Sequence, residues 1–185
     1  MQNFNFENTN FDNAKIIQPF LSEDNRGYFL KNFEKDIFKL NDIDFKVSEI
    51  FESKSIKGVL RGLHFQSSYP QSKLVRTVKG KIYDVIVDIR KDSSTYGKWQ
   101  GFYLSDENRK MLYVPKGFAH GFLTLSEMAI ITYACDGKYI PEYDDGIIWN
   151  DDVLKIVWPT HLVENVVLSE RDKSFKGFRE YNIGI

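Results

Sequence analysis

KIYDVIVDI, residues 81–89, carries the clearest structural signal in the chain. Its odd-numbered positions from Tyr83 to Ile89 are all apolar, whereas the even-numbered positions from Ile82 to Asp88 mix isoleucine with aspartate. A period of two is that of a β-strand, so we predict a strand with one apolar face and one mixed face. The mixed face is either solvated or lines a polar site inside a barrel, and periodicity alone leaves both readings open.

Short β-rich runs of the same kind occupy most of the remaining chain. Turn-forming pairs such as Lys79-Gly80 and Asp136-Gly137 separate many of them, and only residues 34–40 and the tail after Ser169 have a helical pattern. Many close strands with little helix predict an all-β fold, an antiparallel jelly-roll barrel with minor helices, as a single domain over residues 1–185. The expected strands are 14–20, 27–33, 45–51, 74–78, 99–104, 111–114, 121–125 and 129–134.

The composition limits the classes of partner. Lys and Arg total 25 against 26 Asp and Glu, which does not give the basic excess that nucleic-acid binding requires. A single diphosphate is still compatible, because a few placed arginines can hold it. One cysteine excludes an internal disulfide, the polar start lacks the features of a signal peptide, and no stretch approaches a membrane span. We therefore expect a cytoplasmic protein with no nucleic-acid and no membrane partner.

Two of the three histidines, His64 and His120, lie beside glycines in apolar, strand-like surroundings. A buried neutral histidine with one hydrogen bond is the ordinary explanation for either, and the glycines beside both weaken it. Metal sites in jelly rolls need several converging ligands, commonly His-x-His on a strand. The corresponding tripeptide here is His64-Phe65-Gln66, so we expect no metal; a long-range pair of His64 and His120 is the one alternative left.

Several motifs carry a family resemblance, and they occur in order along most of the chain. The most specific are GVLRGLHFQ at 58–66 and PKGFAHGF at 115–122. With KLVRTVKG (73–80), DVIVDIR (84–90), GIIWND (146–151) and LSERD (168–172), they resemble the RmlC-type dTDP-4-dehydrorhamnose 3,5-epimerases. The resemblance implies a cupin jelly roll (double-stranded β-helix), a homodimer, no cofactor, and inversion of C3 and/or C5 of a nucleotide-diphospho-4-keto sugar for surface polysaccharides such as O-antigen or capsule.

The resemblance also assigns catalytic roles. A C4 ketone acidifies the hydrogens on C3 and C5, so inversion through an enolate needs a base on one face of the sugar and an acid on the other. His64 matches the base, with Asp172 orienting its imidazole. Tyr133 matches the acid, because a phenol with a pKa of about 10 is protonated at neutral pH. Lys73 matches the residue that stabilises the enolate oxygen, with Asp84 as the partner of its ammonium group.

The other matched residues are expected to bind the substrate. A guanidinium group offers forked donors to a diphosphate, and an aromatic ring packs against a base. The residues so assigned are Arg26, Arg61 and Arg171 for the diphosphate, Phe29 and Tyr139 for the base, and His120 for a hydrogen bond.

Arg61 and His64 raise a geometric difficulty. Strict alternation places them on opposite faces of one strand, so both can serve one site only if a bulge lies between them. We expect this bulge at Gly62.

The departures from the family pattern lie in the expected nucleotide and sugar contacts. Lys31 and Asp144 each replace a Glu, whereas Glu49 and Phe51 replace a Gln and an Asn. The carboxylate of Glu49 can accept from the N1–H and amino groups of guanine, whereas a site built for one pyrimidine would be penalised by this change. We therefore predict a base other than thymine, and prefer a GDP-4-keto-heptose to a dTDP-4-keto-6-deoxyglucose-like substrate.

Three other functions compete with the epimerase. A non-catalytic sugar-nucleotide-binding cupin should have lost the base or the acid, and both candidates are present. A metal-dependent cupin oxygenase or isomerase is opposed by the missing His-x-His. A sugar 3,4-ketoisomerase shares the fold and the enolate chemistry, so only the stereochemistry of the product separates it.

Overall fold

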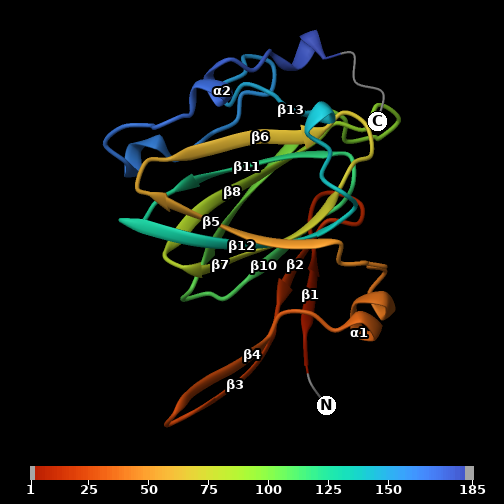
Figure 1. The fold of residues 1–185 in the computed structure, drawn as a ribbon, viewed down its shortest axis with the longest axis vertical. Helices are drawn as coiled ribbons and strands as arrows, with labels where there is room; N and C mark the ends of the chain where they lie inside the picture. The colour runs from red at the N-terminus through yellow and green to blue at the C-terminus, as the bar shows by residue number, and fades with distance from the viewer. Residues whose placement is uncertain (1–2, 182–185) are drawn as a thin grey trace.

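The computed structural model describes residues 3–181, which form two antiparallel sheets that face each other and a projecting hairpin (Figure 1). The six-stranded sheet has the order β1-β2-β10-β7-β12-β5, and the five-stranded sheet has the order β13-β6-β11-β8-β9. The chain crosses repeatedly between the sheets, which confirms the predicted jelly roll. The strands are β1 (Asn5–Asn8), β2 (Lys15–Gln18), β3 (Phe20–Asp24), β4 (Gly27–Lys31), β5 (Glu49–Ile56), β6 (Leu60–Gln66), β7 (Ser72–Lys79), β8 (Lys81–Asp88), β9 (Trp99–Ser105), β10 (Met111–Val114), β11 (Phe118–Thr124), β12 (Met128–Asp136) and β13 (Asp144–Gly146).

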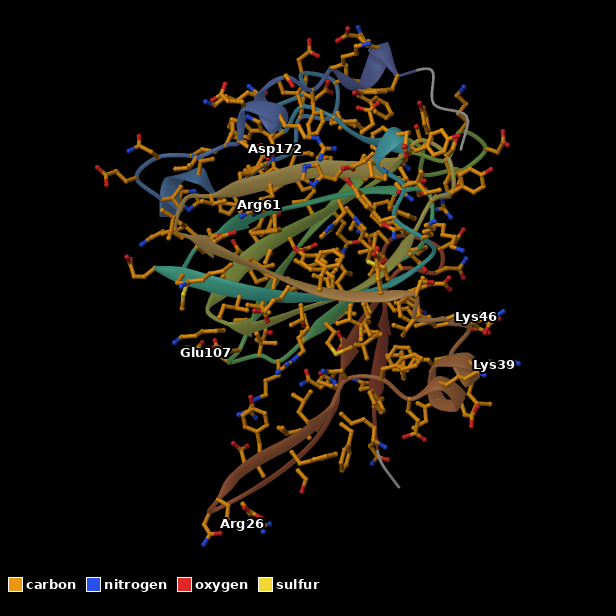
Figure 2. The ribbon with its side chains drawn as sticks, in the orientation of Figure 1. Arg26, Lys39, Lys46, Arg61, Glu107 and Asp172 are labelled. Atoms are coloured by element: carbon orange, nitrogen blue, oxygen red, sulfur yellow. The ribbon has the colours of Figure 1, made fainter. Side chains whose placement is uncertain are left out.

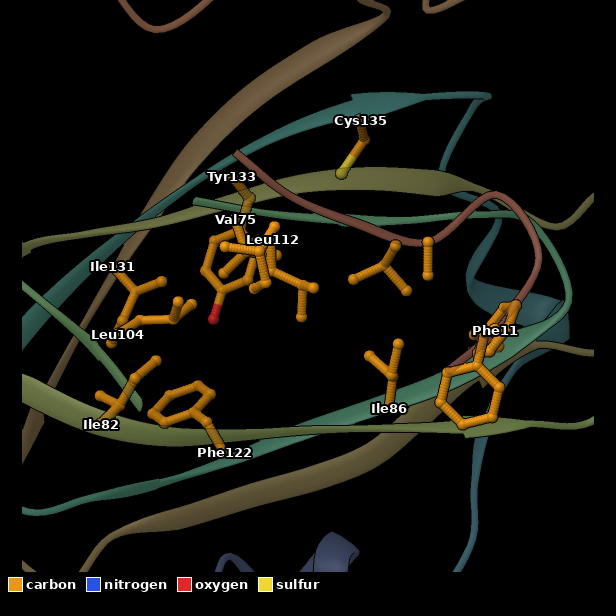
Figure 3. Packing of buried hydrophobic residues seen from close by; sticks show 14 of the residues in the cluster. Phe11, Val75, Ile82, Ile86, Leu104, Leu112, Phe122, Ile131, Tyr133 and Cys135 are labelled. Atoms are coloured by element: carbon orange, nitrogen blue, oxygen red, sulfur yellow. The ribbon is translucent and has the colours of Figure 1, made fainter. Parts of the chain in front are cut away.

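The barrel interior is an apolar core to which both sheets contribute (Figure 3). Val75 and Ile131 come from the six-stranded sheet, and Ile82 and Ile86 come from β8 in the other sheet. The opposite face of β8, with Val85 and Val87, packs under the C-terminal segment that covers the five-stranded sheet. The mixed face predicted for β8 therefore points into the barrel, and its aspartates are buried rather than solvated.

A bulge interrupts the pairing of β6 with β11. His64 lies opposite His120, but Arg61 lies opposite Phe122, so three steps on β6 match two on β11. At Gly62 the backbone has φ +126°, and a Cβ atom there would lie 2.5 Å from the Cα of Gly121. The bulge is where the sequence predicted it, and it allows Arg61 and His64 to reach one site.

The ends of the barrel differ more from expectation. The expected strand 14–20 is divided into β2 and the start of the β3–β4 hairpin, and the expected strand 45–51 begins only at Glu49. Helix α1 (Lys35–Leu40) agrees with the prediction, and its Phe38 is buried in a cluster with Ile17. The tail after Ser169 was predicted to be helical, but it forms only the single turn α2 (Glu170–Lys173) and a 3-10 turn at Phe178–Glu180. No helix within residues 3–181 is long and apolar enough to cross a membrane.

Candidate active site

Two adjoining cavities are lined by residues of both sheets, and we call them the inner and the outer cavity. The inner cavity has a volume of about 200 Å³, and its walls include Arg61, His64, His120 and Tyr133. The outer cavity has a volume of about 340 Å³. Phe51, His64 and Lys73 line both cavities and therefore mark the neck between them.

His64 and Asp172 form a hydrogen-bonded pair, as the resemblance implied. The Nε2 atom of His64 lies 2.6 Å from Oδ1 of Asp172, and the Asp172 side chain is only 5% exposed. The turn α2 places this carboxylate, because the Ser169 side chain accepts from the backbone N–H of Asp172. Burial opposes ionisation, but hydrogen bonds from His64 and Ser169 hold the pKa of Asp172 below its usual value. The carboxylate is therefore ionised at neutral pH and can stabilise an imidazolium.

Tyr133 reaches the inner cavity from the opposite sheet. It lies on β12, whereas His64 lies on β6, so the phenol and the imidazole approach one space from facing walls. Burial raises the pKa of Tyr133, and the negative charge of Asp84 adds to that effect. The phenol is therefore protonated throughout the neutral range and has the form that a proton donor requires.

Lys73, Asp84 and His120 form a polar cluster beside these two residues, and Asp84 and His120 are buried. Burial lowers the pKa of Lys73, and nearby negative groups, Asp144 and Asp84 among them, act in the opposite direction. Both carboxylate oxygens of Asp84 lie 2.9 Å from Nε2 of His120. Asp84 was expected to be the partner of the Lys73 ammonium group, but its hydrogen bonds go to His120, and it acts on Lys73 through charge alone. Burial also raises the pKa of Asp84, against the effects of His120 and Lys73.

The outer cavity gathers several of the residues assigned to binding. The hydroxyl of Tyr139 donates to Oδ2 of Asp144 at 2.8 Å, and Nη1 of Arg171 lies 2.8 Å from the same oxygen. Glu49 also lines this cavity and accepts a hydrogen bond of 2.7 Å from Nε2 of Gln71. Polar groups and an aromatic ring thus meet at an opening of the size that a nucleotide needs.

Arg61 is held on the inner side of the bulge in β6. Its Nε atom donates to Oγ of Ser55 at 3.1 Å, and its Nη2 atom donates to the backbone oxygen of Lys54 at 3.4 Å. Its guanidinium therefore reaches from β6 in the five-stranded sheet to β5 in the six-stranded sheet, and it lines the inner cavity.

Three of the residues assigned to binding lie far from both cavities of this chain. Arg26 is at the tip of the β3–β4 hairpin, at the opposite end of the molecule from Asp172 (Figure 2), and its Nη2 atom lies 2.6 Å from Asp24. Phe29 is exposed on the same hairpin, and Lys31 forms an ion pair of 2.8 Å with Glu34. The sequence could not show this separation, because it depends on the direction in which the hairpin leaves the barrel.

Ser53 and Gln71 were not singled out by the sequence analysis. Ser53 lines the inner cavity, and Gln71 bridges Glu49 and the backbone oxygen of Gly137. The inward alternation of Phe51, Ser53 and Ser55 along β5 is the signal that could have found Ser53.

The alternative of a metal held by two histidines can be compared with the observed contacts. His64 and His120 do lie opposite each other in the β6–β11 pair, but each uses its Nε2 atom to bind its own aspartate. Within residues 3–181, no three side chains of the types His, Cys, Asp and Glu are grouped to hold a metal ion.

Comparisons with known proteins give the family. A family model described as dTDP-4-dehydrorhamnose 3,5-epimerase matches residues 8–180. The dTDP-4-dehydrorhamnose 3,5-epimerase of Methanothermobacter thermautotrophicus is 49% identical over 180 residues, which cover 97% of both chains.

Solved structures agree with this match. The RmlC epimerase of Legionella pneumophila in complex with dTDP-4-keto-L-rhamnose has a TM-score of 0.92 and 43% identity, covering 96% of this chain and 94% of that one. ChmJ from Streptomyces bikiniensis, a 3'-monoepimerase in complex with dTDP-quinovose, has a TM-score of 0.84 and 29% identity, covering 91% and 85%. This chain is therefore an isomerase that belongs to the dTDP-4-dehydrorhamnose 3,5-epimerase family, with its cupin jelly-roll fold.

Proposed function

We propose that this enzyme inverts C3 and/or C5 of a nucleotide-diphospho-4-keto sugar, with His64 as the base and Tyr133 as the acid. One observation carries the proposal: a carboxylate-bound imidazole and a protonated phenol line a single cavity from opposing sheets. A carbon acid between them can lose a proton to one side and regain one from the other.

Nε2 of His64 donates to Asp172, which leaves Nδ1 to take the proton from the sugar carbon. The electron pair of the broken C–H bond moves into the ring and makes the C4 ketone an enolate, whose oxygen the Lys73 ammonium stabilises. The Tyr133 hydroxyl then protonates the carbon from the opposite face and re-forms the ketone. Water takes the proton of His64 and returns one to the Tyr133 phenolate before the next turnover.

Solvent deuterium incorporation tests this mechanism. In D2O, each inverted carbon should carry one deuterium, and NMR should show which of C3 and C5 has exchanged. A 3,4-ketoisomerase would instead give a product with the keto group at C3. Inversion without deuterium, or a shifted keto group, would contradict the proposal.

For the nucleotide, the names and complexes of the relatives support dTDP. Glu49 favours GDP as a second candidate, because its carboxylate lines the outer cavity and guanine presents two adjacent donors. Isothermal titration with GDP and dTDP separates the two, and Glu49→Gln, which restores the family residue, is the matched variant. If Glu49 recognises guanine, GDP should bind more tightly than dTDP to the native protein and lose that advantage in the variant. Equal or tighter dTDP binding to the native protein would remove the GDP candidate.

We also propose a homodimer in which the β3–β4 hairpin supplies Arg26 and Phe29 to the site of the partner subunit. The proposal is supported by the family match of these residues and by the projection of the hairpin away from its own cavities. The exposed rings of Tyr28 and Phe29, 54% and 58% accessible, are also typical of a surface that another chain covers.

Complementation tests the shared site. When Arg26→Ala and His64→Ala chains are mixed and allowed to exchange subunits, half of the sites in each heterodimer should contain both native residues. Recovery of activity supports the shared site, and a mixture no more active than its components contradicts it.

We propose that the enzyme works in the cytoplasm, where a single buried thiol such as Cys135 remains reduced, and that its product enters a surface polysaccharide.

A further inference from the structure

Phe51 and Tyr133 form a stacked aromatic pair at the neck between the two cavities. They lie directly opposite each other in the β5–β12 pair, their ring centroids are 4.8 Å apart, and the rings are inclined by only 17°. Phe51 lines both cavities, whereas Tyr133 lines only the inner one. The ring of Phe51 therefore lies between the phenol and the outer cavity.

The exposures of the two rings show which one meets the solvent. Phe51 is 46% exposed, whereas Tyr133 is only 6% exposed. Tyr133 also meets His120 edge to face, with centroids 6.2 Å apart and an angle of 71°. The phenol thus contacts two rings and points from β12 into the space between the sheets (Figure 3).

We propose that Phe51 is a positioning residue for the proton donor: it fixes the Tyr133 ring and screens the phenol from water in the outer cavity. While the sugar occupies the inner cavity, the proton of the phenol can then pass only to a sugar carbon; water restores that proton after the product has left. This inference rests on the proposed function, because it takes Tyr133 as the donor. At this position the family pattern has an Asn, whose carboxamide would neither stack on the phenol nor exclude water in the same way.

The expected consequence is kinetic. The enolate has two fates: protonation by Tyr133 gives inversion, and return of a proton from the side of His64 gives exchange with retention. A displacement of about 1 Å in a reacting group can cost on the order of 100-fold in rate. A loosened phenol should therefore slow inversion and leave exchange with retention nearly unchanged. The ratio of exchange to inversion reports this directly, and it is independent of the fraction of folded enzyme.

The test compares Phe51→Ala and Phe51→Asn with Phe51→Tyr, which keeps a flat ring. Rates of inversion and of deuterium exchange are measured by NMR in D2O. In the first two variants the ratio of exchange to inversion should rise by about tenfold, and Phe51→Tyr should stay close to the native ratio. The control is Ile50→Ala, because Ile50 precedes Phe51 on β5, is 72% exposed and lines neither cavity. A merely structural role for Phe51 would lower both rates together and leave the ratio unchanged, which would overturn the inference.

A double-mutant comparison shows whether Phe51 acts through Tyr133. In the Tyr133→Phe background, Phe51→Ala should leave the ratio of exchange to inversion where Tyr133→Phe alone has set it. A further rise would mean that Phe51 acts by another route and would overturn the inference. Full inversion by Tyr133→Phe alone would instead remove Tyr133 from the donor role in the proposed function. Impaired inversion by Tyr133→Phe, together with a native ratio in Phe51→Ala, would overturn only the inference drawn here.

Discussion

Two imidazole–carboxylate pairs lie on the β6–β11 strand pair and its neighbours, and they have similar geometry in different surroundings. His64 and His120 are register partners, and their Nε2 atoms lie 2.6 Å and 2.9 Å from Asp172 and Asp84. The side chain of His64 is 30% exposed to the cavities, whereas that of His120 is 5% exposed. Burial acts against ionisation of both carboxyls. At Asp172 the hydrogen bonds outweigh burial and the pKa is lowered, whereas at Asp84 burial prevails and the pKa is raised.

The environment, and not the pair of residue types, decides the role of each imidazole–carboxylate pair. Asp172 remains an anion and has a partner with access to the substrate, which suits a base that becomes positively charged. Asp84 has little solvent and one close hydrogen-bond partner, which suits the fixing of a ring. We therefore assign proton abstraction to the first pair and orientation to the second.

The largest expected effect comes from His64→Ala. Removal of the base should lower both deuterium exchange and inversion by roughly 10²–10⁴-fold, the usual contribution of a general base. The measurement is the rate of solvent deuterium incorporation with a 4-keto sugar nucleotide. His161→Ala is the matched control, because His161 is an exposed histidine outside both cavities. Exchange that survives in His64→Ala would move the base to another residue.

Asp172→Asn should have the next largest effect. An amide cannot stabilise the imidazolium of His64, and it offers its carbonyl oxygen in only one of two orientations. We expect kcat to fall about 100-fold, in the range of general acid–base contributions, with little change in KM. Steady-state kinetics and a melting curve on the same preparation separate catalysis from folding. An unchanged kcat would show that the carboxylate has no part in the reaction.

Asp84→Asn should lower the free energy of unfolding and have a smaller effect on kcat than Asp172→Asn. The change weakens both contacts to His120 inside the barrel, and a weakened buried hydrogen bond costs about 1–3 kcal/mol of the free energy of unfolding. We expect the activity to fall only about tenfold, because the proposed mechanism gives proton abstraction to His64 and not to His120. Urea unfolding measures the loss of stability, and steady-state kinetics measure the loss of kcat. A loss of kcat equal to that of Asp172→Asn, without a loss of stability, would erase the distinction between the two pairs.

The sequence predicted the barrel because its signals are local. The alternation of residues 81–89 gave the two faces of β8, and the conflict between Arg61 and His64 located the bulge at Gly62. Motif order was enough to select His64, Tyr133 and Lys73 as lining residues, and the structure places all three around one space.

Features that depend on long-range packing were missed or misassigned. The choice of Asp84 between Lys73 and His120 depends on which neighbouring strand brings its side chain closer, and no pattern within one strand carries that information. The stacking of Phe51 on Tyr133 requires the register of β5 on β12, which joins segments about 80 residues apart in a way that only the folded sheet defines. The hairpin with Arg26 leaves the barrel after a break at Pro19 between β2 and β3. The expected strand 14–20 ran through this proline, although proline cannot donate to a strand ladder and commonly ends a strand.

The smallest effect, and the sharpest comparison of the two pairs, is the pH dependence of stability. The folded-state pKa of Asp172 is below 3.8, so its contribution is complete above about pH 3.8 and is lost as the pH falls through the folded-state value. The folded-state pKa of Asp84 is above 3.8, so its contribution is complete below about pH 3.8 and is lost as the pH rises through the folded-state value.

Urea unfolding between about pH 3 and pH 5, below the range in which histidine titrates, should therefore give opposite trends for the two Asn variants. With rising pH, the deficit of Asp172→Asn relative to the native protein should grow, and that of Asp84→Asn should shrink. Two deficits that change in the same direction would mean that the two carboxyls share one environment, contrary to the division of roles.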